Sequence, residues 1–148
     1  MTAPARRPPI APIVQAVTWL ADWLACVVLA RAHHPTLAID AVATACLLAA
    51  CAVAVYGNGC VLVPRLLRRG RIAAYLAALV GTTLASATVG VMVIQVVYDV
   101  MWGPDPLRYG FAFNLATDWL AVVLHVAAAM GLTRFTPRAR TPLREPPE

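Results

Sequence analysis

Two ionisable residues, Asp22 and His125, lie inside long apolar stretches of the sequence. Asp22 stands between Trp19 and Trp23, midway along the first stretch, and His125 lies at a similar depth in the last one. A central aspartate costs a membrane-spanning helix about 2.5–3.5 kcal/mol on insertion scales, so it needs a partner. An Asp–His pair could relay a proton, or it could join two helices through a structural hydrogen bond.

A second group of charged residues is predicted near the outer ends of the apolar stretches: Asp40, Asp99, Asp118 and Arg31, flanked by His33, His34 and Arg108. Carboxylates and histidines at one depth could bind a metal ion or sense pH. Alternatively, these are interfacial residues whose charged ends reach water and pair with the two arginines. Because His-x-x-x-His and Glu-x-x-His spacings are missing from the sequence, we predict no metal site.

The remaining chemistry-bearing residues do not form a recognisable catalytic motif. The cysteines all lie inside apolar stretches and include no Cys-x-x-Cys, so we interpret them as small apolar residues: Cys26, Cys46, Cys51 and Cys60. The sequence contains no phosphate-binding loop, no Gly-x-Ser-x-Gly and no zinc signature. It therefore provides no basis for an enzymatic function or a cofactor, although an intramembrane active site would need few residues.

Composition indicates which elements must position the polar residues. Of the 148 residues, 61% are hydrophobic and 13% are charged, whereas soluble domains have about 45–50% apolar and about 25% charged residues. Four apolar stretches, 13–32, 37–63, 72–102 and 112–132, approach the length that crosses a ~30 Å hydrocarbon core. The sequence predicts an all-α integral membrane four-helix bundle over 12–132, with disordered proline-rich tails at 1–11 and 133–148.

The arginines predict the orientation of this bundle. The chain has twelve Lys and Arg residues, all of them Arg, and a net charge of +5. They cluster before the first stretch, between the second and third, and after the fourth, while Arg31 and Arg108 lie on the other side. The positive-inside rule therefore places both termini in the cytoplasm. Abundant Ala without Lys is typical of a GC-rich bacterial genome, so we expect a multi-pass protein of the bacterial inner membrane and no nucleic-acid partner.

Small residues in the third stretch predict close helix packing. Ala77, Gly81 and Ala85 recur at four-residue spacing, and Ser86 and Gly90 form a neighbouring row. Such rows let helices approach closely, either within the chain or in a homodimer.

The end of the second stretch resembles a known family. Tyr56, Asn58, Leu62, Pro64, Arg65 and Leu67, with Tyr75 and Leu76 after a basic turn, match the pattern by which a helix exits to the cytoplasm in LytS/YehU-like bacterial sensor histidine kinases. The segment also makes physical sense by itself. Pro64 should end the helix, the arginines from Arg65 to Arg71 should lie at anionic headgroups, and Tyr75 should anchor the return.

The resemblance implies a transmembrane sensor module that lacks the kinase domain and signals through helix packing. The partners expected are the lipid bilayer, a second copy of the chain, and a cytoplasmic kinase or another membrane subunit. Two alternatives come from the residues alone: a small proton-coupled transporter that uses Asp22, or an accessory subunit whose polar residues only assemble a complex.

Overall fold

The computed structural model describes residues 10–30, 36–103 and 109–135, and this part of the chain is helical without strands. The long helices are α1 (Ile10–Ala30), α2 (Leu37–Gly57), α4 (Ile72–Trp102) and α5 (Phe111–Phe135). α2 continues through a π-helical turn (η1, Asn58–Leu62) into the short α3 (Val63–Arg65) and a 3-10 turn (η2, Leu67–Arg69). The all-helical prediction is confirmed. Arg31, His33, His34 and Arg108 lie outside the described residues.

Three of the four predicted spans have the length and hydropathy of a membrane helix. These are Leu37–Arg69, Ile72–Trp102 and Phe111–Leu132. The apolar segment of α1 is shorter, Ile13–Leu29. Helix extends at both ends into segments predicted to be disordered, since α1 begins at Ile10 and α5 reaches Phe135. Pro12 does not prevent this, because the first turn of a helix needs no backbone donor there.

The expectation that Pro64 ends the second helix is wrong. The structure places Pro64 inside α3, and helical backbone continues to Arg69. In the preceding π-turn the Val63 amide donates to the Asn58 carbonyl, five residues back. This change of hydrogen-bond pattern puts Pro64 in the first turn of a new α-helical segment, where its missing N–H is tolerated.

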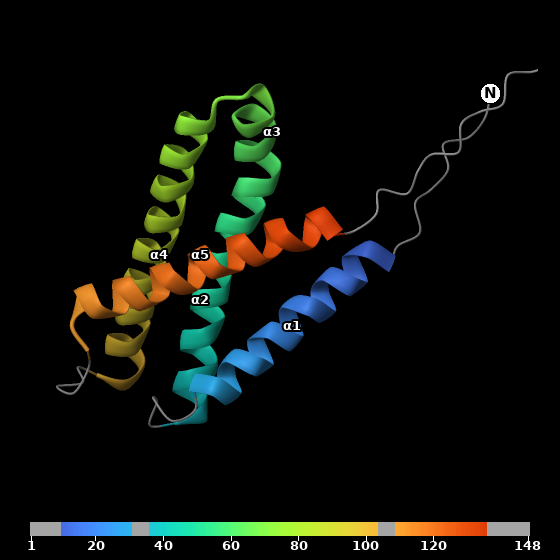
Figure 1. Cartoon of the computed structure of the whole chain (residues 1–148). Coiled ribbons are helices and arrows are strands. Elements are labelled where there is room, and N and C mark those ends of the chain that lie inside the picture. The colour runs from blue at the N-terminus through green and yellow to red at the C-terminus, as the bar shows by residue number, and fades with distance from the viewer. Residues whose placement is uncertain (1–9, 31–35, 104–108, 136–148) are drawn as a thin grey trace, which may run out of the picture.

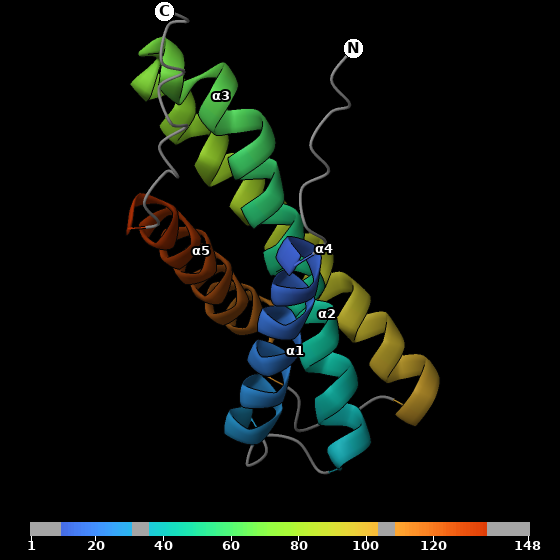
Figure 2. The same cartoon turned by 90° about the vertical axis from the view of Figure 1, so that its right-hand side faces the viewer.

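α2 and α4 form an antiparallel hairpin on which the other two helices pack. α5 contacts both α2 and α4, whereas α1 packs mainly on α2 (Figure 1). The tip of the hairpin rises beyond the ends of α1 and α5 (Figure 2). With 31 residues, α4 is about 46 Å long, so it exceeds a ~30 Å hydrocarbon core.

The turn at the hairpin tip depends on a glycine. Gly70 has φ +72°, a left-handed conformation that ends the 3-10 turn, and its amide donates to the Leu67 carbonyl at 3.1 Å. A residue with a Cβ would be strained at this position. The chain then reverses into α4 within two residues.

Small residues make up the centre of the bundle. The buried cluster joins α2, α4 and α5 and consists of Ala50, Cys51, Ala54, Ala87, Val122 and Val126. A Cβ added at Gly90 would lie 3.2 Å from the Ala50 Cβ, so Gly90 allows α2 and α4 to approach closely. A Cβ at Gly81 would meet nothing within 4 Å. The row containing Gly90 therefore packs inside the chain, and the row containing Gly81 lies on the surface.

Candidate functional site

Asp22 and His125 form a direct contact between the first and last helices. The Nε2 atom of His125 on α5 lies 3.0 Å from Oδ2 of Asp22 on α1, across 103 positions of sequence. Both helices have their main backbone contacts elsewhere, α1 with α2 and α5 with the hairpin. The predicted pairing of these two residues is thus present in the structure, and it links helices that otherwise share little direct packing.

The second ring nitrogen of His125 defines the chemistry of the pair. Nδ1 lies 2.7 Å from the carbonyl oxygen of Ala121. A carbonyl can only accept, so Nδ1 carries a hydrogen. If the imidazole is neutral, Nε2 is then an acceptor and Asp22 must be protonated to donate to it. If the imidazole is charged, Nε2 donates to the carboxylate. Either way, one proton lies between Nε2 and Oδ2, and its loss removes the hydrogen bond.

Further titratable groups surround this pair. Cys51 of α2 is fully buried, and its thiol lies within electrostatic range of Asp22, Cys26 and Asp118. Asp118 is half-buried and precedes His125 by two helical turns, so both lie on one face of α5. Carboxylate, imidazole and thiol groups are therefore carried by three helices, α1, α2 and α5. Within the described ranges, no three of these side chains are arranged to hold a metal ion.

Polar contacts continue from Asp22 toward the start of α1. Trp19 donates from Nε1 to the Tyr56 hydroxyl at 2.8 Å, and the Gln15 amide also donates to this hydroxyl. We call Gln15, Trp19, Asp22, Tyr56 and His125 the polar seam. It connects α1 with the end of α2 and with α5.

The Gln15 and Trp19 contacts were not predicted, although the sequence contains a signal for them. Gln15, Trp19, Asp22 and Cys26 recur at the spacing i, i+4, i+7 and i+11, which places them on one helix face.

The polar seam is open on one side of the chain. The side chain of Asp22 is 35% exposed and that of His125 is 24% exposed, while Gln15 and Tyr56 are exposed residues. Oδ1 of Asp22 makes no hydrogen bond to any residue that the structure describes. The pair therefore lies at a surface and not in a sealed core.

Two residues of the motif quoted from the sequence, Asn58 and Tyr75, form a second polar contact inside the hairpin. The Tyr75 hydroxyl lies 3.1 Å from Oδ1 of Asn58 and 3.3 Å from the sulfur of Met130. Tyr75 and Asn58 are both buried. The expectation that Tyr75 anchors α4 at a membrane surface is therefore wrong, because its hydroxyl is turned toward α2 and α5.

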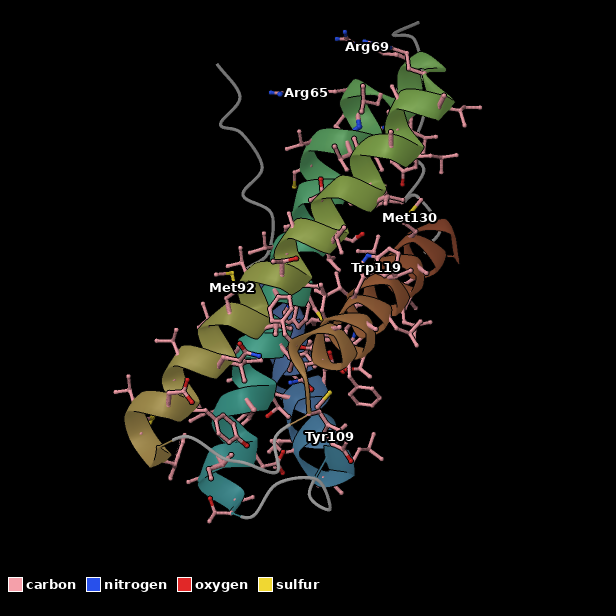
Figure 3. All side chains as sticks on the ribbon, turned by 90° about the vertical axis from the view of Figure 1, so that its left-hand side faces the viewer. Arg65, Arg69, Met92, Tyr109, Trp119 and Met130 are labelled. Carbon is pink, nitrogen blue, oxygen red and sulfur yellow. The ribbon has the colours of Figure 1, made fainter. Side chains whose placement is uncertain are left out.

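Trp119 and Met130 attach α5 to the hairpin. Both side chains lie between α5 and the hairpin helices (Figure 3). Trp119 donates from Nε1 to the hydroxyl of Thr83 on α4 at 3.1 Å. The Thr83 hydroxyl in turn donates to the Leu79 carbonyl of its own helix. This contact could not be predicted from the sequence, because threonine is common in apolar helices.

The members of the predicted outer cluster that the structure describes differ in exposure. Asp40 is completely buried, Asp99 is exposed and Asp118 is half-buried. Asp40 was expected to reach water, but it shares a face of α2 with Cys51 and Ala54, which pack against α4 and α5. Arg31, the fourth member, is outside the described residues.

The arginines of the motif lie at the opposite end of the molecule from Tyr109. Arg65, Arg68, Arg69 and Arg71 are all exposed. Arg65 and Arg69 extend away from the hairpin tip, and Tyr109 lies near the start of α5 (Figure 3). No acidic residue occurs between Asp40 and Asp99 in the sequence, so the tip is purely basic.

Comparison of the chain with protein families, with curated proteins and with solved structures gives no match.

Proposed function

We propose that this chain is a multi-pass protein of the bacterial inner membrane with both termini in the cytoplasm, and that it acts as an input module. Its four long helices would cross the bilayer, and the Asp22–His125 bond would couple the first to the last. The observation that carries this proposal is the 3.0 Å contact between the first and the last helix of the described residues.

The arrangement suits signalling through helix packing. The buried core of small residues joins α5 to the hairpin of α2 and α4, whereas α1 is joined to α5 through the polar seam. A change at Asp22 or His125 would therefore shift α1 relative to α5 and the hairpin. α1 and α5 lead to the proline-rich tails, where a cytoplasmic kinase or another subunit would respond.

The stimulus that fits this site is a change in protonation. The Asp22–His125 bond requires one proton, and the titratable groups nearest to it along the two helices are Cys26, one turn after Asp22, and Asp118, two turns before His125. Loss of the shared proton would leave a lone pair of Nε2 opposite a carboxylate, which is repulsive. The proposal therefore predicts that α1 and α5 separate when the pair loses its proton.

Spin-label distances would test the coupling. Labels at Val14→Cys on α1 and Ala128→Cys on α5, both exposed positions, would be placed in a chain whose native cysteines are replaced by alanine. In lipid nanodiscs, Asp22→Leu should broaden and lengthen the distance distribution, while Asp99→Leu, a matched change at an exposed carboxylate, should leave it unchanged. Identical distributions in both variants would contradict the proposal.

Proton-coupled transport is a second candidate, and one observation favours it. Asp118 is half-buried and lies two helical turns before His125 on the same face of α5, so titratable groups extend along α5 from the Asp22–His125 pair toward the start of the helix. A transporter requires such a series, whereas an input module requires only the pair. Asp118→Asn should abolish flux driven by a pH gradient in proteoliposomes if the chain transports. It should leave the α1–α5 distance unchanged if the chain is an input module.

A further inference from the structure

We propose that the tip of the hairpin binds the headgroup of an anionic phospholipid, and that Arg65 and Arg69 hold its phosphate. This inference rests on the membrane arrangement proposed above, in which the tip lies at the cytoplasmic surface. It goes further than the positive-inside rule, which requires only that arginines stay in the cytoplasm and predicts no preference for one lipid over another.

The tip carries positive charges close together. Arg65 and Arg69 are four residues apart in helical backbone, at the ends of α3 and η2, and their side chains extend to the same side of the hairpin (Figure 3). Like charges at this spacing repel each other. Arg68 and Arg71 add two further exposed charges to the same turn. An anion bound beside the guanidinium groups would remove this repulsion.

The described part of the chain offers these arginines no acidic partner. None of the four guanidinium groups forms a hydrogen bond or an ion pair with a residue that the structure describes. The sequence has no acidic residue between Asp40 and Asp99. Residues 1–9 contain two arginines and no acid, and residues 136–148 contain three arginines against two glutamates. The terminal segments are therefore basic as well, and the counter-charge is expected from another molecule.

The surface next to the arginines is apolar, which favours a lipid over a soluble acidic partner. Val61 precedes Arg65 by one helical turn and is 40% exposed. On the other arm, α4 begins directly after Arg71 with Ile72, and Ile72 and Leu76 are both exposed. A phospholipid complements both parts of this surface, because its phosphate is charged and its acyl chains cover aliphatic side chains. A soluble acidic protein would complement the charge alone.

The shape of the tip leaves the arginines accessible to a headgroup. The tip rises beyond the ends of α1 and α5, so neither helix covers it (Figure 2). A guanidinium group is planar, and its N–H donors form a fork that matches phosphate oxygens. Two such groups one turn apart can donate to one phosphate from two directions. Arg65 and Arg69 therefore form a defined site, whereas a single surface arginine would add only to a diffuse positive potential.

Lipid retention in native mass spectrometry would test this site. The full chain is placed in nanodiscs made from equal amounts of phosphatidylglycerol and phosphatidylcholine, and the lipids that stay bound after release are identified. Phosphatidylglycerol should be enriched among them. The double variant Arg65→Gln, Arg69→Gln should lower the ratio of bound phosphatidylglycerol to phosphatidylcholine by up to about thirtyfold, as expected for two arginine contacts at an anionic surface.

A matched double variant controls for net charge. Arg68→Gln, Arg71→Gln removes the same charge from the same turn and should have a clearly smaller effect on the lipid ratio. All four side chains are exposed, so both double variants should keep the helical content of the parent chain in circular dichroism. Equal losses of phosphatidylglycerol in the two variants would show a diffuse basic surface and overturn the assignment to Arg65 and Arg69.

The remaining outcomes separate this proposal from the proposed function. A chain that does not enter nanodiscs refutes the membrane arrangement, whereas a chain that enters them without enriching phosphatidylglycerol refutes the lipid site alone. Displacement of bound phosphatidylglycerol by inorganic phosphate would mean that the site takes any free anion. Binding of soluble polyglutamate through Arg65 and Arg69, with no preference among lipids, would assign the tip to an acidic protein. Either result overturns the proposal.

Discussion

The hydroxyl of Tyr75 at the start of α4 lies 3.1 Å from the side-chain oxygen of Asn58 at the end of α2. This contact joins the two arms of the hairpin next to the turn, and the Met130 sulfur of α5 meets the same hydroxyl at 3.3 Å. The spacing of Asn58 and Tyr75 in the sequence therefore has a structural reason in this chain, because it brings the two side chains together across the turn.

Removing this hydroxyl should weaken the hairpin. Tyr75→Phe keeps the ring but removes the hydroxyl, which leaves the side-chain Oδ1 of Asn58 buried without its donor. We therefore predict a loss of about 0.5–1.5 kcal/mol in the free energy of unfolding. The measurement is reversible unfolding in mixed micelles. Tyr109→Phe makes the same change at a tyrosine that is 61% exposed and should be neutral. Equal effects of the two variants would show that the Asn58 contact contributes nothing.

The two rows of small residues on α4 should respond differently to added bulk. Gly90→Leu forces side-chain atoms against Ala50, which already lies 3.2 Å from the Cβ position, and should cost about 1–3 kcal/mol by overpacking. Gly81→Leu meets open space and should not lower stability. Thermal unfolding of the two variants, followed by circular dichroism, distinguishes them. A stable Gly90→Leu protein would mean that α2 and α4 do not pack as closely as described.

The exposed ends of the bundle should lie on opposite sides of the membrane. In the chain with native cysteines replaced, Arg69→Cys at the hairpin tip should react with an impermeant maleimide only in inside-out vesicles. Tyr109→Cys should react only in right-side-out vesicles. The physical reason is the positive-inside rule applied to the arginines of the tip. Labelling of both positions from the same side would refute the proposed topology.

Sequence reasoning predicted those features that depend on one residue and its depth. The all-helical class follows from the apolar stretches, because a backbone without water must form its hydrogen bonds within the helix. The Asp22–His125 pair follows from two ionisable side chains at equal depth, each of which needs a polar partner. The small residue Gly90 also packs closely, as its row indicated. In each case one physical requirement was sufficient for the prediction, so the arrangement of the neighbouring helices was not needed.

Features that depend on which helix faces which were not predicted. Asp40 was assigned to an interface because it lies near a helix end, but its face of α2 is covered by other helices. Tyr75 was assigned to an interface for the same reason and is buried instead. Trp119 finds Thr83 only because α5 crosses α4. The position of a residue along a helix can be predicted from the sequence. The side of the helix that is covered by neighbours can be known only when the packing of the whole bundle is known.

The energetic coupling between Asp22 and His125 is the most direct test of the account. A double-mutant cycle with Asp22→Leu, His125→Leu and the double variant, unfolded from lipid bicelles, isolates their interaction from other effects of each change. The account predicts a favourable coupling of about 0.6–1.7 kcal/mol, the range of hydrogen bonds between membrane helices. Additive single effects, with no coupling, would contradict the claim that this pair joins the first helix to the last.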